Sequence, residues 1–290
     1  MERILRKTLL IIVSPLFMCC TTNGAAKKEI KSSEIIQLLK KGEPVQIAGK
    51  IILDDLDFTV ALQPYIVTPG MLQVAINSNI FFTDCIFMGK VTSNGQVESI
   101  PAHTIFKNNL VFTGCDFRGG VDFSNAVVTG MNNFSKSVFR EDARFDNLYG
   151  WGKDNYFSEV KAEKGFSMVY AAFLGNLYFP DAVFEEGFSL QETSVKGKLS
   201  FNNAVFGQEA GFDLIQVDGP AFFNYAVFRK GANFSFSKFL HNVEFIQSRF
   251  EEKGVIEQAF FLNQVRFEQV DIEKDLIIKD SHLEHINTDK

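Results

Sequence analysis

The chain has 290 residues, of which 22% are charged, and a formal net charge of −6. Its hydrophobic fraction of 46% excludes a wholly disordered chain, because that much apolar surface can form a core. The acidic balance and the lack of a basic stripe argue against nucleic acid as a partner. Phenylalanine occurs 32 times, against 6 Tyr and 1 Trp, so a core of plain apolar rings is expected.

Residues 1–18 have the features of an export signal: basic residues precede an apolar run too short to span a bilayer. Cys19 and Cys20 follow directly. This order resembles a bacterial lipoprotein leader, and the resemblance implies that one of the two cysteines carries lipid after cleavage. A plain signal peptide, cleaved after Gly24 or Ala25, is the alternative.

Residues 19–31 are predicted to form the anchor and a short tether of mixed charge, and residues 32–42 a short helix. Ser32 or Ser33 can cap the start of this helix, and Gly42 can end it. Its isoleucines and leucines form one apolar stripe, so it is expected to cover apolar surface elsewhere in the chain.

From Met168 to Leu283, an apolar residue recurs at alternating steps of 5 and 6 residues. A second series of uncharged, mostly small residues lies two positions before each of these. Residues two apart in an extended segment point to the same face, so each unit buries one small and one large side chain. A constant 11-residue super-period fits neither a helix nor a free strand, and the chain is therefore predicted to turn after every unit.

Four such units make a coil of 22 residues, and equivalent residues then stack at the strand spacing of about 4.8 Å. Phenylalanine is expected to stack on phenylalanine along the axis, which buries aromatic area without a polar atom to satisfy. The predicted members of these core stacks include Phe201, Phe212, Phe223, Phe234 and Phe245.

The strings AVF at 182–184, 204–206 and 226–228 and ANF at 232–234 resemble the units of pentapeptide-repeat proteins. The resemblance implies an all-β solenoid, a right-handed four-sided parallel β-helix over residues 43–290. The chain departs from the strict pentad by one extra residue in every second unit. The helix at 32–42 is expected to cap the first coil, because a solenoid end exposes apolar surface and unpaired strand edges.

The same register extends toward the N-terminus with three disturbances. It slips by one residue within YGWGKDNY (149–156), where the two glycines predict a bulge or turn. Longer interruptions at 60–73 and 88–103 are predicted to be protruding loops.

Few residues suggest chemistry. Cys85 and Cys115 occupy small inward positions, as apolar fillers or as partners in a disulfide, and the sequence leaves both alternatives open. His282 and His285 have a spacing that could hold a metal on a helix, but they fall in a β-register near the end of the chain. No metal and no cofactor are predicted.

Tyr156, Tyr178 and Phe222 each precede an inward Phe and differ by multiples of 22, so they are expected to share one face. Such a strip could stack against sugar rings or a partner protein. The alternative is that these aromatic residues simply favour an outward β position.

The predicted function is a non-enzymatic scaffold, lipid-anchored in the bacterial cell envelope on the outer-membrane or periplasmic side. Its expected partners are the membrane, through the anchor, and an envelope protein or glycan; two rods could also pair end to end. A secreted polysaccharide-active enzyme is the second hypothesis, but the outward acids occur at repeat corners among lysines. A mimic of DNA that binds topoisomerases is the third; the export leader and the mixed surface charges weaken it.

Overall fold

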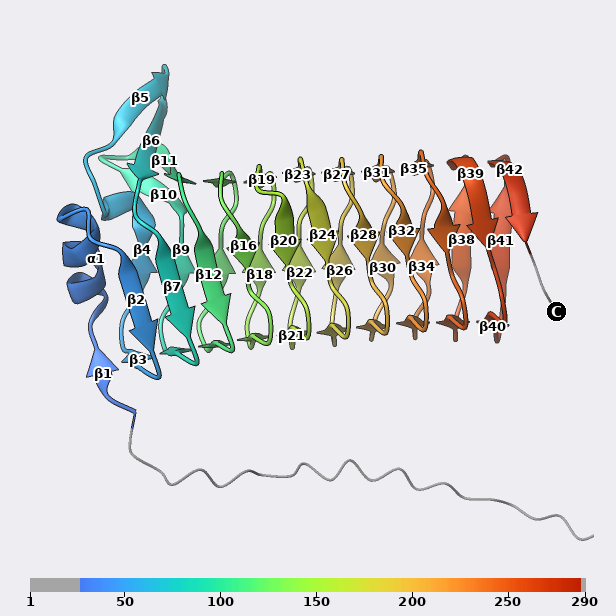
Figure 1. Cartoon of the computed structure of the whole chain (residues 1–290), viewed down its shortest axis with the longest axis horizontal. Coiled ribbons are helices and arrows are strands. Elements are labelled where there is room, and N and C mark those ends of the chain that lie inside the picture. Colours follow the sequence, from blue (N-terminus) through green and yellow to red (C-terminus); the bar gives the residue numbers. More distant parts are fainter. Residues whose placement is uncertain (1–26, 288–290) are drawn as a thin grey trace, which may run out of the picture.

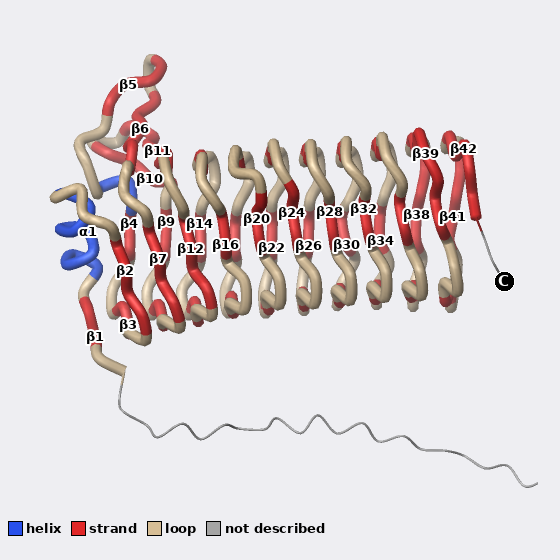
Figure 2. The backbone as a smooth tube through the Cα atoms, in the orientation of Figure 1, coloured by secondary structure: helices blue, strands red, loops and turns tan. Residues whose placement is uncertain are grey.

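In the computed structural model, which describes residues 27–287, the chain winds into one elongated parallel β-solenoid (Figure 1). Short strands stack along the long axis and are joined by tight turns (Figure 2). Most strands have only two residues, because the chain turns a corner after each pair of outward and inward side chains. The strands form three sheets of 11, 10 and 21 strands.

The 11-stranded sheet contains β1 (Glu29–Ile30), β3 (Ile51–Ile52), β8 (Ile86–Phe87), β13 (Asp116–Phe117), β17 (Val138–Phe139), β21 (Lys161–Ala162), β25 (Val183–Phe184), β29 (Val205–Phe206), β33 (Val227–Phe228), β37 (Arg249–Phe250) and β40 (Asp271–Ile272). The 10-stranded sheet contains β4 (Leu56–Asp57), β9 (Val91–Thr92), β14 (Val121–Asp122), β18 (Ala143–Arg144), β22 (Phe166–Ser167), β26 (Phe188–Ser189), β30 (Ala210–Gly211), β34 (Ala232–Asn233), β38 (Gly254–Glu257) and β41 (Leu276–Lys279).

The 21-stranded sheet contains β2 (Val45–Ala48), β5 (Tyr65–Thr68), β6 (Met71–Ile76), β7 (Ile80–Thr83), β10 (Asn94–Val97), β11 (Ile100–Phe106), β12 (Leu110–Thr113), β15 (Val127–Val128), β16 (Asn132–Asn133), β19 (Tyr149–Gly150), β20 (Asp154–Tyr156), β23 (Ala172–Phe173), β24 (Asn176–Tyr178), β27 (Ser194–Val195), β28 (Leu199–Ser200), β31 (Gln216–Val217), β32 (Ala221–Phe222), β35 (Lys238–Phe239), β36 (Val243–Glu244), β39 (Phe260–Arg266) and β42 (His282–Asn287).

Two kinds of corner alternate along the chain. In the tighter one, two residues separate a large inward residue from the next small one, as between Phe123 and Ala126, whose N–H donates to the Phe123 carbonyl at 3.2 Å. The second of these two residues has a positive φ, here +60° at Asn125, as a type II turn requires. A residue with positive φ recurs about every 11 residues from Asn125 as far as Asp280. In the wider corner, three residues separate the inward positions.

The longest continuous element of the core is a column of nine phenylalanine rings. Neighbouring rings lie 4.7 to 5.7 Å apart between centroids and are within 21° of parallel. The column consists of Phe82, Phe112, Phe134, Phe157, Phe179, Phe201, Phe223, Phe245 and Phe267. In a neighbouring column, Phe212 and Phe234 are stacked at 4.8 Å and 3°. Each stacked ring buries apolar area and meets its neighbours in a favourable offset geometry.

In one turn, a small residue stands at a large inward position and a large residue stands at a small one. The two changes compensate in volume. Ala162 occupies a position that holds Phe139 one turn before it and Phe184 one turn after it. Phe166, at a position that is small in most turns, fills the space: its ring lies 5.8 Å from Phe139 and 5.2 Å from Phe184. The core volume of the turn is therefore conserved although the repeat pattern is broken.

A nine-residue helix, α1 (Ser32–Lys40), lies at the N-terminal end of the solenoid (Figure 1). Ile35, Ile36 and Leu39 are buried in the same hydrophobic cluster as the columns. The predicted serine cap is wrong: the N-cap residue is Lys31, whose N–H donates to Glu34 at 3.1 Å. Among residues 27–287, no helix is long and apolar enough to cross a membrane.

The end of the predicted tether (19–31) also differs from expectation. β1 pairs in parallel with β3, so Glu29 and Ile30 already belong to the solenoid. Asp54, on the next turn, accepts the N–H of Ser32 at 2.7 Å, and this hydrogen bond lowers the pKa of the Asp54 carboxyl.

The two predicted loops are β-hairpins. β5 pairs antiparallel with β6, and β10 pairs antiparallel with β11, while β6 and β11 pair in parallel with each other. The hairpin of β5 and β6 projects beside the N-terminal end of the rod (Figure 1). Its tip exposes apolar side chains, with Ile66 exposed to 73%.

The last turn departs from the predicted inward pattern. Ile272 and Ile278 fall in the inward series, yet both are 42% exposed. Within the described residues, no further turn lies over them, whereas the equivalent Phe250 and Ile256 one turn earlier are fully buried.

Candidate functional site

The three aromatic residues that the sequence places on one face lie on three of four successively paired strands of the 21-stranded sheet. Tyr156 of β20 is in register with Tyr178 of β24, and their rings are stacked at 5.3 Å and 14°. Ser200 of β28 follows, and then Phe222 of β32. Lys198 places its ammonium 5.4 Å from the centroid of the Phe222 ring, a distance suited to a cation–π contact.

Polar side chains lie beside the tyrosine pair. Asp154 and Asn176 precede the two tyrosines by two residues and are in register with each other. The Asn176 Nδ2 donates to Asp154 Oδ1 at 2.7 Å, and the Lys198 backbone N–H donates to Asn176 Oδ1 at 2.8 Å. Partial burial, with the negative charge of Asp154 as a second cause, raises the pKa of both tyrosines.

The register slip creates a hollow next to Tyr156. Four residues separate the inward Gly150 from the inward Asn155, one more than at the other wide corners. The extra residue lies in the corner after β19. The hollow there is lined by Thr129, Gly130, Met131, Gly152, Lys153, Asp154 and Tyr156.

Close packing fixes the backbone of this corner. A Cβ on Gly152 would lie 2.1 Å from the Gly130 carbonyl oxygen, and a Cβ on Gly150 would lie 2.6 Å from the Phe173 ring. Both glycines are therefore required by the approach of the neighbouring turns. Behind the corner, the amides of Asn132 and Asn155 are buried, and the Asn132 side chain has no hydrogen-bond partner within the described protein.

Further aromatic residues around the slip were not predicted. Tyr149 and Trp151 are exposed to 40% and 52%, and Tyr170 and Leu174 on the next turn to 57% and 59%. Their outward positions follow from the register on either side of the slip. The sequence pattern of an aromatic residue before an inward Phe does not include them; at Tyr149, for example, Gly150 stands where the inward Phe is expected.

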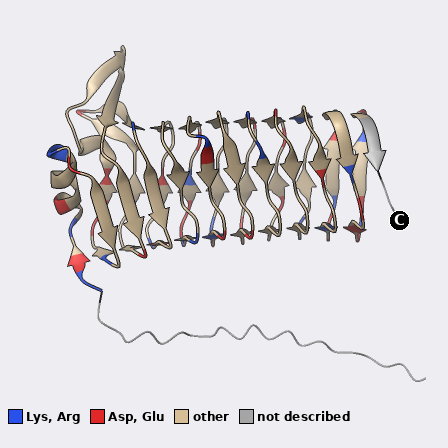
Figure 3. Ribbon diagram, viewed as in Figure 1, with Lys and Arg blue, Asp and Glu red and all other residues tan. Residues whose placement is uncertain are grey.

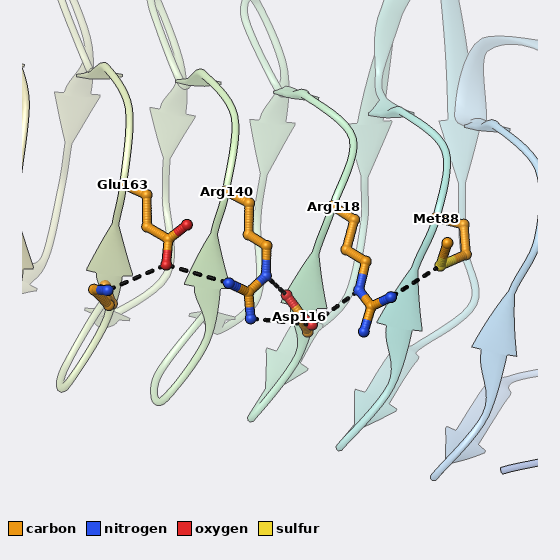
Figure 4. Close-up of polar contacts among 6 residues, drawn as sticks. Met88, Asp116, Arg118, Arg140 and Glu163 are labelled. Atoms are coloured by element: carbon orange, nitrogen blue, oxygen red, sulfur yellow. Dashed lines mark hydrogen bonds and ion pairs between the residues drawn. The ribbon is translucent and has the colours of Figure 1, made fainter. Parts of the chain in front are cut away.

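Acidic and basic side chains on a neighbouring face form a ladder along the axis (Figure 4). Arg140 donates to Asp116 at 2.6 Å and to Glu163 at 3.2 Å, on the two adjacent turns. Lys161 then joins Glu163 at 3.1 Å to Glu185 at 2.9 Å. Asp116 and Glu163 together raise the pKa of Arg140. Each pair is partly exposed and contributes only about 0.2 to 1 kcal/mol.

The outward acids that an enzyme would need are held in such pairs. Glu185 bonds to Lys161, Glu186 to Lys164 at 2.7 Å, Glu251 to Arg249, and Glu252 to Lys274. In Figure 3, acidic and basic positions both occur along the ribbon of the rod, so the described residues form no uniformly acidic series in this view. Within residues 27–287, no group of three His, Cys, Asp or Glu side chains could hold a metal ion.

Cys85 and Cys115 stand on adjacent turns as free, buried thiols. Their strands pair so that Ile86 is opposite Asp116, and the cysteine directly before each is therefore stacked. The Cys85 Sγ lies 3.5 Å from the Ile47 carbonyl oxygen. Contact with Cys85 and burial together raise the pKa of Cys115 far above its usual range, so this thiol stays protonated.

The histidines are dispersed. His282 lies on β42 with its ring stacked on Phe260 at 5.1 Å, and His103 lies on β11 with its Nε2 at 2.9 Å from the Gln73 side-chain nitrogen. His241 is exposed at a corner. The candidate lipidation residues Cys19 and Cys20 lie outside the described residues.

Comparison with known proteins identifies a repeat family in part of this solenoid. Residues 103–148 match the model of pentapeptide repeats (9 copies). The pentapeptide-repeat match begins in β11 and ends in the residue before β19, and it supports the repeat family for this part of the solenoid. No curated protein matches the chain. No solved structure matches it either.

Proposed function

We propose that the chain is a non-catalytic scaffold, anchored by lipid in the bacterial cell envelope, whose rod presents a surface to an envelope glycan or protein. The observation that carries the scaffold role is that many outward charges are paired between successive turns. Acids and bases of successive turns bind each other, as Arg140 does with Asp116 and Glu163. These carboxylates are therefore committed to holding a rigid surface together rather than free to act as acids or bases.

The anchoring role is supported by the leader and by where the chain enters the rod. Residues 1–18 carry the export pattern, and Cys19 or Cys20 is the residue that we propose for lipidation. From Lys27 the chain runs into β1, at the same end of the solenoid as α1 (Figure 1). An anchor on either cysteine then holds this end close to the membrane on the outer-membrane or periplasmic side, with the rod extending from it.

We also propose the finer geometry that the repeat family implies: a right-handed coil of four sides with α1 as its cap. Four series of inward residues, each repeating at 22, support the four sides. The burial of Ile35, Ile36 and Leu39 against the first turn supports the capping role.

The test of anchoring uses the full chain in a bacterial host with metabolic labelling by a fatty-acid analogue. Cys19→Ala and Cys20→Ala are made separately and together. One single variant is expected to lose the label and leave the membrane fraction, and the double variant to match it. Labelling that persists in the double variant, or no labelling of the natural chain, contradicts the proposal.

A further inference from the structure

We propose that the hollow beside Tyr156 is a carbohydrate subsite, which holds one pyranose ring of an extended β-linked glycan. This inference rests on the proposed function, which brings the rod to an envelope glycan, and it names the site and the ligand class. The hollow exists because the chain inserts one residue into an otherwise regular corner. Irregular insertions of this kind are commonly retained where they re-aim side chains.

The Tyr156 ring supplies an apolar platform. Tyr178 covers one of its faces at 5.3 Å. The opposite face looks toward the preceding turn, where Asn133 is the residue in register and where the hollow lies. A pyranose has one face of C–H groups that packs against such a ring, as other apolar groups do.

Groups that hydrogen-bond to hydroxyls surround this platform. Asp154 and Lys153 both line the hollow. Asp154 accepts from Asn176 through Oδ1 and also has a hydrogen bond with the Tyr156 hydroxyl. A carboxylate has about four lone-pair sites, so Asp154 can still accept from a sugar hydroxyl. Lys153 adds ammonium donors and balances the charge of Asp154. The combination suits a neutral ligand that is rich in hydroxyls, with one apolar face.

The structure favours a glycan over a peptide at this place. The strands around the hollow are paired on both edges, in the order β12, β16, β20, β24 and β28. No backbone edge is left for an extended peptide to add a strand. Successive outward residues repeat along the axis at the strand spacing of about 4.8 Å, which is close to the sugar repeat of an extended β-1,4-linked chain. A chain that runs parallel to the axis can therefore match successive outward positions beside the hollow.

The experiment titrates the full chain in detergent with chitohexaose, cellohexaose and maltohexaose. Binding is followed by calorimetry and by the emission of Trp151, the single tryptophan, which lies in the inserted corner and is 52% exposed. At least one of the two β-1,4-linked hexamers is expected to bind, at least tenfold more tightly than α-linked maltohexaose, whose chain coils away from the axis.

The variants separate stacking from stability. Tyr156→Ala is expected to weaken binding at least tenfold, whereas Tyr156→Phe, which keeps the ring, weakens it less than threefold. Asp154→Asn is expected to weaken it severalfold. Tyr225→Ala is the matched control, because Tyr225 is 53% exposed at a turn that does not line the hollow; it should bind as the natural chain does, with unchanged thermal unfolding.

Two results overturn the inference. One is the absence of binding to both β-linked hexamers at millimolar concentration. The other is equal affinity of Tyr156→Ala and the natural chain. Neither result affects the lipid-labelling experiment, so failure of this site and failure of the anchoring proposal are distinguishable.

Discussion

The regular turns after Phe157 and the interrupted turns before Phe106 use the same core in different ways. In the regular region, equivalent residues are 22 apart, as are Phe201 and Phe223. Near the N-terminus the separation grows to 30 between Phe82 and Phe112, and the extra residues leave the rod as a hairpin. The rings of Phe82 and Phe112 still stack at 5.0 Å and 12°. The inward columns therefore set the geometry, and corners absorb insertions at small entropic cost.

The largest effect on stability is expected from a charge placed inside a column of the regular region. Phe234 is fully buried, whereas Phe236, two residues later, is 48% exposed. Phe234→Asp should unfold the middle of the rod, because an unpaired buried carboxylate adds to the loss of a ring. Phe223→Ala should cost about 3 to 5 kcal/mol in the free energy of unfolding. Denaturant unfolding measures both, with Phe236→Asp as the control that should change little; an unchanged Phe234→Asp would refute the inward assignment.

The slip gives a more local test of packing. Gly150→Ala places a Cβ against the Phe173 ring and should destabilise the rod by about 1 to 3 kcal/mol. The two following turns carry Val195 and Val217 at the position of Phe173. Adding Phe173→Val should therefore restore part of the loss in the Gly150→Ala background, because the added Cβ also lies 2.6 Å from Asn155 Oδ1. A double variant less stable than either single one would show that the clash is not the cause.

The interrupted region should also be the more sensitive to acid. Burial lowers the pKa of His103 below its ordinary 6.5, so the folded state favours the neutral ring. The stability that this ring contributes is complete above pH 6.5 and is lost as the pH falls below it. The protection of the β10 and β11 amides against hydrogen exchange should fall between pH 7 and pH 5 relative to the protection of regular strands. His103→Gln should remove the difference; an equal fall in that variant would exclude His103 as the cause.

The smallest expected effect concerns the tight corners. Asn125 and Asn147 fill early corners with a residue that tolerates positive φ, whereas Leu214 occupies a later one at φ +59° and is 45% exposed. Leu214→Asn should raise the free energy of unfolding by up to about 1 kcal/mol, because the strain of a bulky residue is relieved. Leu214→Ala keeps a Cβ and should gain less. Equal gains from both would point to exposure rather than backbone strain.

Much of this arrangement can be predicted from the sequence, because the same pattern of inward residues repeats along the chain. Phe223 has an uncharged residue two positions before it, and the same small-and-large pair recurs 22 residues later. This recurrence suffices to predict stacked inward columns. The hairpins were predicted only as loops, since their own pairing is local and does not share the period. The helix cap was misread because the group that accepts the Ser32 N–H is Asp54, 22 residues away.

The candidate site was predictable in part. Tyr156, Tyr178 and Phe222 were found because each stands before an inward Phe in an unbroken register. The exposed position of Trp151 and the hollow were not predicted, because both arise only where that register breaks. The depth of a corner depends on which backbone segments pack against it, as the Gly130 backbone packs against Gly152. The sequence period does not predict this packing.

The nine-ring column has a consequence for how the molecule can change in size. Because the turns after Phe201 repeat every 22 residues and each ring of the column stacks on the rings one turn before and after it, removing or adding a complete block of 22 residues between Phe201 and Phe267 joins similar surfaces. The cross-section is then preserved while the reach of the rod changes by about 4.8 Å for each block. The architecture therefore behaves as a molecular ruler whose length can be edited in whole steps.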